Sequence, residues 1–237
     1  LTRAVQSHLI ADAHIKLGVF LSGGIDSSII AAILVSLGVR VHAFTIGMAG
    51  SRDAAAAVKV AHALGLDHTK ITITAEMALS ALPDVVQHLE SFSPVLCMDA
   101  IPQFLLYAEA AKRDVRIIFT GEGADELFAG YSYFSAFQTA EEVHECCSYL
   151  LEELHASQLV RVDRCSMAHG VEARVPFLDT NFVEFAMQID PASKMSKRAS
   201  DTKALLRRAF SGMLPDEILW RAKLPGHDGY GGNWKQR

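Results

Sequence analysis

Leu17–Ser28, which reads LGVFLSGGIDSS, is the stretch that decides the fold of this chain. The uncharged run Val19–Leu21 is typical of a short strand that is covered on both faces of a sheet. Gly23 and Gly24 then allow positive φ and let the backbone approach a ligand closely. Because a serine-led apolar run follows and stops at Gly38, the pattern predicts a strand, a tight turn and a helix.

The turn of this stretch has the chemistry of an anion site. Backbone N–H groups and hydroxyls gather at a helix start, where the helix dipole also favours negative charge, so phosphate is the leading candidate. Asp26 would repel a bare phosphate but suits one that arrives with Mg²⁺. The alternative, a plain strand-to-helix turn rich in Ser and Gly, leaves Asp26 unexplained. The turn matches neither a Walker loop nor a dinucleotide fingerprint.

Composition excludes several other classes. The chain has 237 residues, of which 50% are hydrophobic and 21% charged, which is ordinary for a soluble globular protein. A net charge of −5 gives no bulk attraction to nucleic acid. The sequence shows no signal peptide and no apolar run of the roughly 18 residues that a membrane span needs. The four cysteines form no C-x-x-C pair, which favours reduced thiols and a cytoplasmic location. The chain starts at Leu1 and not at a methionine, which by itself does not distinguish a full-length protein from a fragment.

Strand and helix patterns alternate through the first half of the chain. Apolar runs predict four strands, which end near Leu21, Ile46, Thr74 and Thr120. Helices are expected between them, including one capped by Asp53, one interrupted by Pro83 and one that begins at Pro102. This alternation predicts an α/β fold, in which a parallel, twisted sheet carries helices on both faces.

The second half has no strand pattern after about residue 131. Helical runs occupy residues 141–157, 180–188, 201–210 and 215–222, so we expect a helical layer beside the strand ends. The chain is therefore interpreted as a single domain, with an α/β nucleotide-binding core in residues 1–130 and a mainly helical part in residues 131–237.

A second constellation follows the fourth strand directly. Thr120–Tyr131 reads TGEGADELFAGY and holds three carboxylates within five residues. Since parallel strands end at one edge of a sheet, this loop and the first turn should lie together. Acids clustered near a phosphate are costly unless a cation lies among them, so Asp26 and Asp125 are the predicted Mg²⁺ ligands. The alternative is an acidic loop that only caps a helix through Asp125.

Four motifs occur in a fixed order: SGGIDSS at residues 22–28, GEGADELFAGY at 121–131, DRCSMAHGVEARVPFLD at 163–179 and WRAK at 220–223. Together they resemble the synthetase domain of the glutamine-hydrolysing asparagine synthetases, within the N-type ATP pyrophosphatases. The likeness extends over nearly the whole chain. It implies a Rossmann-like fold of the adenine nucleotide alpha hydrolase type. It also implies that aspartate reacts with ATP to give a β-aspartyl-adenylate and pyrophosphate, after which ammonia forms asparagine and AMP.

The resemblance also implies roles for individual residues. It assigns pyrophosphate and Mg²⁺ to Ser22, Gly23, Gly24, Asp26 and Ser27, and it assigns the adenosine site, partly through backbone, to Phe20, Leu21, Ile46, Thr120 and Gly121. Asp125 would support the metal or the substrate. Glu122 would be the base for the incoming ammonia. Lys223 would be a fixed cation for charge that builds on the α-phosphate; without the resemblance it reads as a solvated lysine after a helix.

Two departures from the family pattern bear on substrate and partner. No cysteine precedes Cys97, so we expect ammonia to be free or to come from a glutaminase domain or subunit outside this sequence. Met98 stands where the family carries an arginine that recognises aspartate, so a bidentate carboxylate clamp is missing there.

Two alternative functions stay open. One is a related adenylating amidotransferase that acts on another carboxylate, such as a sugar or cell-wall acid. The other is a non-catalytic nucleotide-binding relative. Lactam-forming relatives carry Tyr in place of Glu122, which argues against ring closure. No nucleic acid or membrane partner is expected, and a homodimer stays open.

Overall fold

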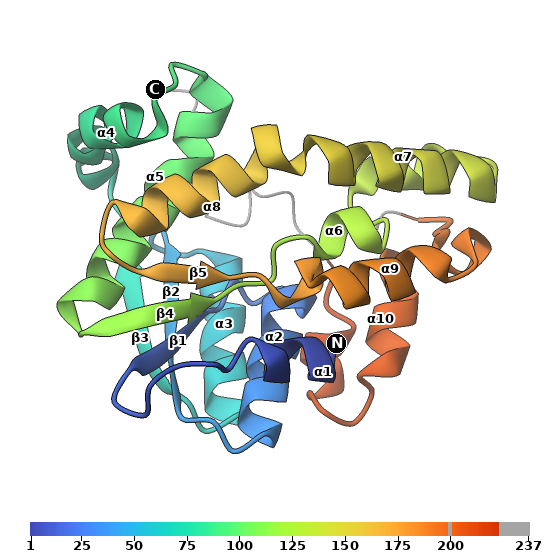
Figure 1. Ribbon diagram of the computed structural model, residues 1–237, viewed down its shortest axis with the longest axis horizontal. Helices are drawn as coiled ribbons and strands as arrows, with labels where there is room; N and C mark the ends of the chain where they lie inside the picture. The colour runs from blue at the N-terminus through green and yellow to red at the C-terminus, as the bar shows by residue number, and fades with distance from the viewer. Residues whose placement is uncertain (199–200, 223–237) are drawn as a thin grey trace.

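A parallel five-stranded sheet forms the centre of the computed structural model, which describes residues 1–198 and 201–222 (Figure 1). In spatial order its strands are β3 (Asp67–Thr72), β2 (Val41–Gly47), β1 (Lys16–Phe20), β4 (Val115–Phe119) and β5 (Glu172–Arg174). All four neighbouring pairs are parallel. The predicted sheet type and the first four strands are confirmed.

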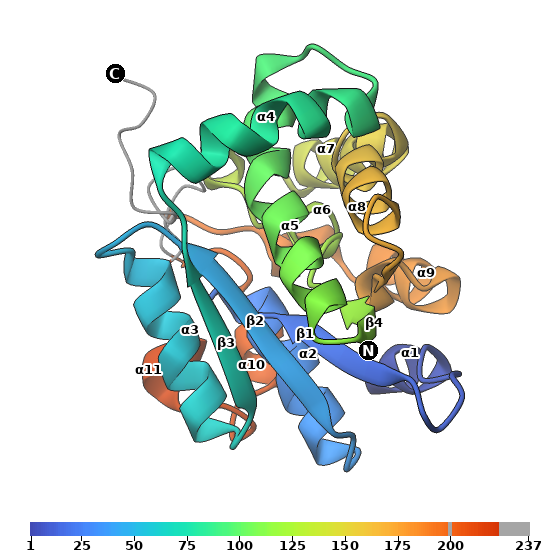
Figure 2. The same ribbon diagram turned by 90° about the vertical axis from the view of Figure 1, so that its left-hand side faces the viewer.

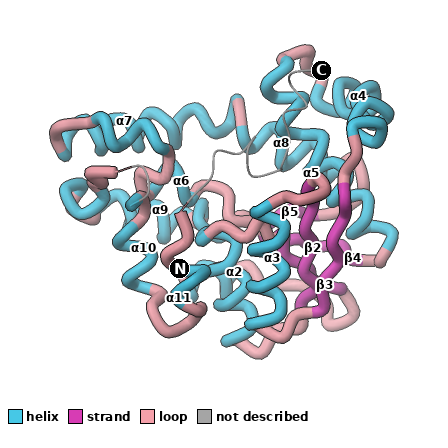
Figure 3. Tube along the Cα trace, turned by 180° about the vertical axis from the view of Figure 1, so that it is seen from behind, coloured by secondary structure: helices cyan, strands magenta, loops and turns pink. Residues whose placement is uncertain are grey.

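Helices cover both faces of the sheet, as the alternating pattern predicts (Figure 2). One face is packed by α2 (Ile25–Ser36) and α3 (Arg52–Ala63), and residues of α1, α9, α10 and α11 complete that core. The other face is packed by α4 (Ala75–Leu89), α5 (Pro94–Lys112) and α8 (Gln158–Met167). The remaining helices are short or peripheral: α1 (Thr2–Ser7), α6 (Ala124–Leu127), α7 (Ala140–Glu153), α9 (Thr180–Gln188), α10 (Ala204–Ala209) and α11 (Asp216–Leu219). Seen from behind, the strands lie together at one side among these helices (Figure 3).

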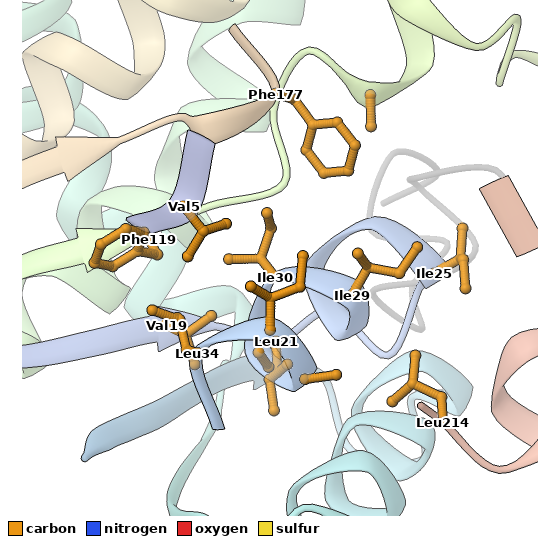
Figure 4. Close-up of a cluster of buried hydrophobic side chains, with 14 of the residues drawn as sticks. Val5, Val19, Leu21, Ile25, Ile29, Ile30, Leu34, Phe119, Phe177 and Leu214 are labelled. Atoms are coloured by element: carbon orange, nitrogen blue, oxygen red, sulfur yellow. The ribbon is translucent and has the colours of Figure 1, made fainter. Parts of the chain in front are cut away.

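Helix α2 is buried along most of its length. Ile29, Ile30 and Leu34 are fully buried, because α2 is apolar around most of its circumference rather than along one stripe. Figure 4 shows these side chains between Val19 of β1 and Phe177 of the second half of the chain. This packing fixes the N-terminus of α2 against the end of β1.

The strand order reverses between β1 and β4. From β1 the chain builds outward through β2 and β3, whereas β4 and β5 lie on the other side of β1. A reversal of this kind leaves a crevice outside the carboxyl ends of the two central strands, where open α/β sheets bind ligands. The two sequence constellations, Ser22–Ser28 and Thr120–Tyr131, directly follow β1 and β4.

The expectation that no strand follows residue 131 is wrong. β5 (Glu172–Arg174) pairs in parallel with β4, and the Thr120 N–H donates to the Arg174 carbonyl at 2.9 Å. The strand has only three residues, two of them charged, so it carries no hydrophobic run or alternation. Pairing with β4 therefore decides this strand, and local preference does not.

Two helix starts also differ from the expectation. Helix α5 begins at Pro94 instead of Pro102, because Ser93 caps it by accepting from the Leu96 N–H at 3.5 Å. Pro94 fills the first helical position, where the missing N–H costs nothing, and Pro102 lies inside the helix. Helix α3 is capped by Ser51, and Asp53 lies in its first turn. Pro83 lies inside α4 without ending it. Helix α8 was not predicted from the sequence.

Within the described ranges, no helix is long and apolar enough to cross a membrane. All four cysteines are free thiols in the structure.

We expect Ile30→Ala to lower the free energy of unfolding by about 2–5 kcal/mol, because it leaves a cavity in the core around α2. Urea unfolding would measure this loss. The matched control is Ile10→Ala, at a side chain that is 82% exposed, and we expect a change within about 0.5 kcal/mol there. Equal losses in the two variants would contradict the assignment of the core.

Candidate active site

The turn between β1 and α2 is held by its own serines. The Ser22 N–H donates to the Ser27 hydroxyl at 3.2 Å, and the two hydroxyl oxygens lie 3.1 Å apart. The Ser28 hydroxyl donates to the Gly24 carbonyl at 2.6 Å. Among the described residues no side chain caps α2 at Gly24, so the first N–H groups of the helix are left for another acceptor. This is the arrangement that favours an anion at a helix N-terminus.

The two predicted loops touch each other. Gly23 takes the positive φ that the sequence suggested, at +75°, whereas Gly24 remains extended. A Cβ atom at Gly121 would lie 2.8 Å from the Ser27 nitrogen and 2.9 Å from the Asp26 Cβ. Only glycine therefore lets the acidic loop after β4 pack directly on the turn after β1.

Lys203 joins the two predicted metal ligands. Its Nζ lies 2.6 Å from the Asp26 Oδ1 and 2.7 Å from the Asp125 Oδ1, and its side chain is only 1% exposed. Burial alone would lower the pKa of Lys203, but the charges of Asp125 and Asp26 outweigh it and the pKa lies above its ordinary value. Sequence reasoning missed this lysine, because it lies far along the chain from Asp26 and belongs to no motif.

The pair Asp26 and Asp125 suits a magnesium ion that arrives with phosphates. One oxygen of each carboxylate lies within 2.7 Å of the Lys203 Nζ, so the ammonium occupies the position between the two Oδ1 atoms. Mg²⁺ would bind through the second oxygen of each carboxylate. Across the part of the chain that the structure describes, no group of three His, Cys, Asp or Glu side chains could hold a metal. Mg²⁺ commonly takes one or two carboxylates and completes its shell with water and substrate phosphates. Their role as metal ligands stays a prediction.

Glu122, the predicted base, faces α5 and α8. Its Oε1 accepts from the Gln103 Nε2 at 3.1 Å and lies 3.4 Å from the Arg161 Nη2. The Arg161 Nη1 lies 3.6 Å from the Asp99 Oδ2, next to Met98. Sequence reasoning missed Gln103 and Arg161, since α8 was not expected and neither residue belongs to a motif.

The third acid of the loop, Glu126, faces away from the cation position. Its Oε1 accepts from the Tyr131 hydroxyl at 2.5 Å, and the Gln158 amide nitrogen lies 3.5 Å from the same oxygen. Burial raises the pKa of Glu126 above its ordinary value. The three carboxylates of the acidic loop thus have three different surroundings.

The predicted adenosine-site residues lie at the ends of β1, β2 and β4. The side chains of Phe20, Leu21, Ile46 and Thr120 are buried, so only their backbone is suited to face a nucleotide. The Leu21 carbonyl already accepts from the Thr45 hydroxyl at 2.7 Å. Their nucleotide contacts stay predictions.

Lys223 lies outside the described residues. Arg221, two residues earlier, donates from Nη1 to the Gly23 carbonyl at 3.0 Å and pairs with Asp53. The C-terminal segment therefore reaches the turn after β1 just before Lys223 in the sequence.

We expect Lys203→Met to lower the free energy of unfolding by about 3 kcal/mol, because two carboxylates would keep facing each other without a cation. Thermal and urea unfolding would measure the loss, and added Mg²⁺ should restore part of it. The matched control is Lys59→Met, at a surface pair with Glu217 whose side chains are both 61% exposed. We expect about 1 kcal/mol or less there, with no effect of Mg²⁺. An equal loss in both variants would refute the bridge.

Comparison with known proteins identifies the family of the chain. The asparagine synthase family model matches residues 1–141 and 135–236. The chain is 37% identical, over 98% of its length, to the glutamine-hydrolyzing asparagine synthetase B of Escherichia coli K12, of which it covers 44%. It is also 37% identical, over 99% of its length, to a probable asparagine synthetase of Schizosaccharomyces pombe, of which it covers 46%.

The chain thus spans a little under half the length of these two relatives. Among solved structures, an NMN synthetase from Francisella tularensis superposes with a TM-score of 0.41 at 16% identity, over 95% of each chain. Because the family model covers nearly every residue and the sequence identity extends from end to end, this chain belongs to the asparagine synthase family.

Proposed function

We propose that this chain is the synthetase part of an ATP-dependent amide-forming enzyme that converts aspartate to asparagine. The single observation that carries the proposal is the direct packing of the acidic loop, which carries Asp125, on the uncapped start of α2, which carries Asp26. A phosphate chain with its magnesium ion has the charge pattern that such a place requires. The names of the relatives support the choice of amide synthesis.

In the proposed first step, an oxygen of the aspartate β-carboxylate attacks the α-phosphorus of ATP. The bond from that phosphorus to the oxygen bridging to the β-phosphorus breaks, and pyrophosphate leaves. The N–H groups at the start of α2 would hold the phosphates in line, and Asp26 and Asp125 would hold Mg²⁺, which neutralises phosphate charge when it is bound. Lys203, which bridges the Oδ1 atoms of the two acids, would hold them in place, and Lys223 would add fixed positive charge.

In the second step, ammonia attacks the acyl carbon of the adenylate. The bond from that carbon to the phosphate oxygen breaks and AMP leaves, while the nitrogen loses a proton. Glu122 is the proposed acceptor of that proton, because both of its contacts in the described structure use Oε1, which leaves Oε2 for the nucleophile. Adenosine would lie against the backbone at Phe20, Leu21, Ile46, Thr120 and Gly121.

The ammonia source and the location of the protein form part of the proposal. Since the relatives are named as glutamine-hydrolyzing, a glutaminase domain or subunit would supply ammonia to this chain. Four free thiols and a reaction that consumes ATP support a cytoplasmic location.

One observation favours a second acyl donor. Met98 supplies no charge where an arginine clamp for aspartate is expected. A related adenylating amidotransferase that acts on another carboxylate is therefore the second candidate. The intact set of Asp26, Glu122 and Asp125 argues against a non-catalytic nucleotide-binding relative.

The test is pyrophosphate release from Mg-ATP with ammonium chloride and a panel of carboxylic acids, with product analysis. We expect release with aspartate, accompanied by asparagine and AMP, and none in Asp26→Asn because a metal-binding carboxylate is lost. Release only with another acid would favour the second candidate. Nucleotide binding without release from any acid would refute catalysis by this chain.

We expect Glu122→Gln to slow amide formation by roughly 10²–10⁴-fold, as loss of a general base does. Glutamine keeps the size of the side chain and can still pair with Gln103, so adenylation should change much less. Separate measurement of ATP–pyrophosphate exchange and of amide product distinguishes the two steps. An unchanged rate of amide formation would limit Glu122 to shaping the loop.

A further inference from the structure

A polar stripe follows one face of α5 from solvent toward the core. Asp99, Gln103 and Tyr107 are spaced four residues apart, which places them above one another on the helix. The Asp99 side chain is 57% exposed, whereas Tyr107 is fully buried. Arg161 from α8 and Glu122 from the acidic loop line the same stripe through their contacts with Asp99 and Gln103.

The amide of Gln103 has only one orientation that its surroundings permit. Its nitrogen must face the Glu122 Oε1, at 3.1 Å, because the opposite orientation would set an amide oxygen against a carboxylate oxygen. The Gln103 Oε1 is then turned elsewhere. It is buried and accepts no hydrogen bond from any residue that the structure describes. Such an oxygen is costly in a folded protein unless a ligand or a water molecule donates to it.

The acidic loop adds a second hydrogen-bond acceptor to this stripe. The Glu122 carboxylate has Oε2 remaining, and the Tyr107 hydroxyl, also buried, has no hydrogen-bond partner within the described ranges. Burial, followed by the charge of Glu122, raises the pKa of Tyr107 well above its ordinary value, so this hydroxyl stays neutral. Two carboxylates, Asp99 and Glu122, face the single guanidinium of Arg161, so the stripe keeps a net negative charge that would repel an anion.

We infer that Gln103 and Glu122 together form a subsite for a ligand nitrogen that carries N–H groups. The Gln103 Oε1 and the Glu122 Oε2 would accept hydrogen bonds from that nitrogen. The Gln103 Nε2, which donates to the Glu122 Oε1, would hold Glu122 in place. The inference rests on the proposed function and adds Gln103 to it as a specificity residue. Two ligands have this chemistry, namely ammonia or ammonium as the nucleophile and the ammonium group of an amino-acid acyl donor.

The test compares Gln103→Leu with Gln103→Asn and with the control Gln87→Leu, at an exposed glutamine on α4. Leucine favours the helix and removes the amide, whereas asparagine retains both the amide oxygen and the amide nitrogen. We expect Gln103→Leu to raise the KM for the N–H ligand about tenfold, which corresponds to one lost hydrogen bond. Gln103→Asn should raise this KM less than Gln103→Leu does, because it retains an acceptor oxygen.

The arms of the assay distinguish the two ligands. A rise in the KM for ammonium alone identifies the nucleophile. A rise in the KM for aspartate, with lost discrimination against succinate, identifies the ammonium group of the acyl donor. If neither KM moves while the wild type turns over, the inference fails and the proposed function stands. If both glutamine-103 variants lose activity together, Gln103 is structural and the inference fails.

A binding measurement keeps the inference testable if the wild type shows no turnover, which would refute the proposed function alone. Thermal unfolding of the wild type is compared in ammonium chloride and sodium chloride at matched ionic strength, and in aspartate and succinate. We expect ammonium or aspartate to stabilise the wild type and the Gln87→Leu control, and this stabilisation to be lost in Gln103→Leu. Equal stabilisation in all three proteins, or in none, would overturn the subsite.

Discussion

The buried ammonium of Lys203 is the contact on which the rest of the site depends. The parallel sheet brings the turn after β1 and the loop after β4 to the same edge, but each carries an aspartate toward the other. Two carboxylates at this separation repel each other strongly in a partly buried place. Lys203 supplies the opposing charge. Gly121 has no side chain, so the loop after β4 can pack directly on the turn after β1. Without both, the loops would separate.

The acidic loop also divides the site into two chemical environments. On the side of α2, helix N–H groups and a cation position suit phosphate and its counter-ion. On the side of α5 and α8, an amide and a guanidinium contact the Glu122 carboxylate. A loop of a few residues after β4 can therefore present two carboxylates to different surroundings, because Asp125 contacts Lys203 and Glu122 contacts Gln103 and Arg161.

Where the sequence analysis failed, long-range contacts decided the structure. Strand β5 is too short and too charged to be recognised, and it forms because β4 offers it an open edge. The start of α5 was misjudged because Pro94 and Pro102 both suit a first helical turn, and only the Ser93 cap distinguishes them. Gln103, Arg161 and Lys203 carry no motif, so their importance appears only when distant elements pack together.

The sequence by itself determined the sheet type, the first four strands and the two loops that follow β1 and β4. These features are local, since an apolar run, a pair of glycines and a cluster of acids each act within a few residues. Tertiary structure alone decided the strand order, the cation that joins Asp26 to Asp125 and the partners of Glu122. The physical reason is that charge neutralisation and hydrogen bonding in this site are made by side chains far apart in the chain, and their pairing depends on which helices cover which face of the sheet.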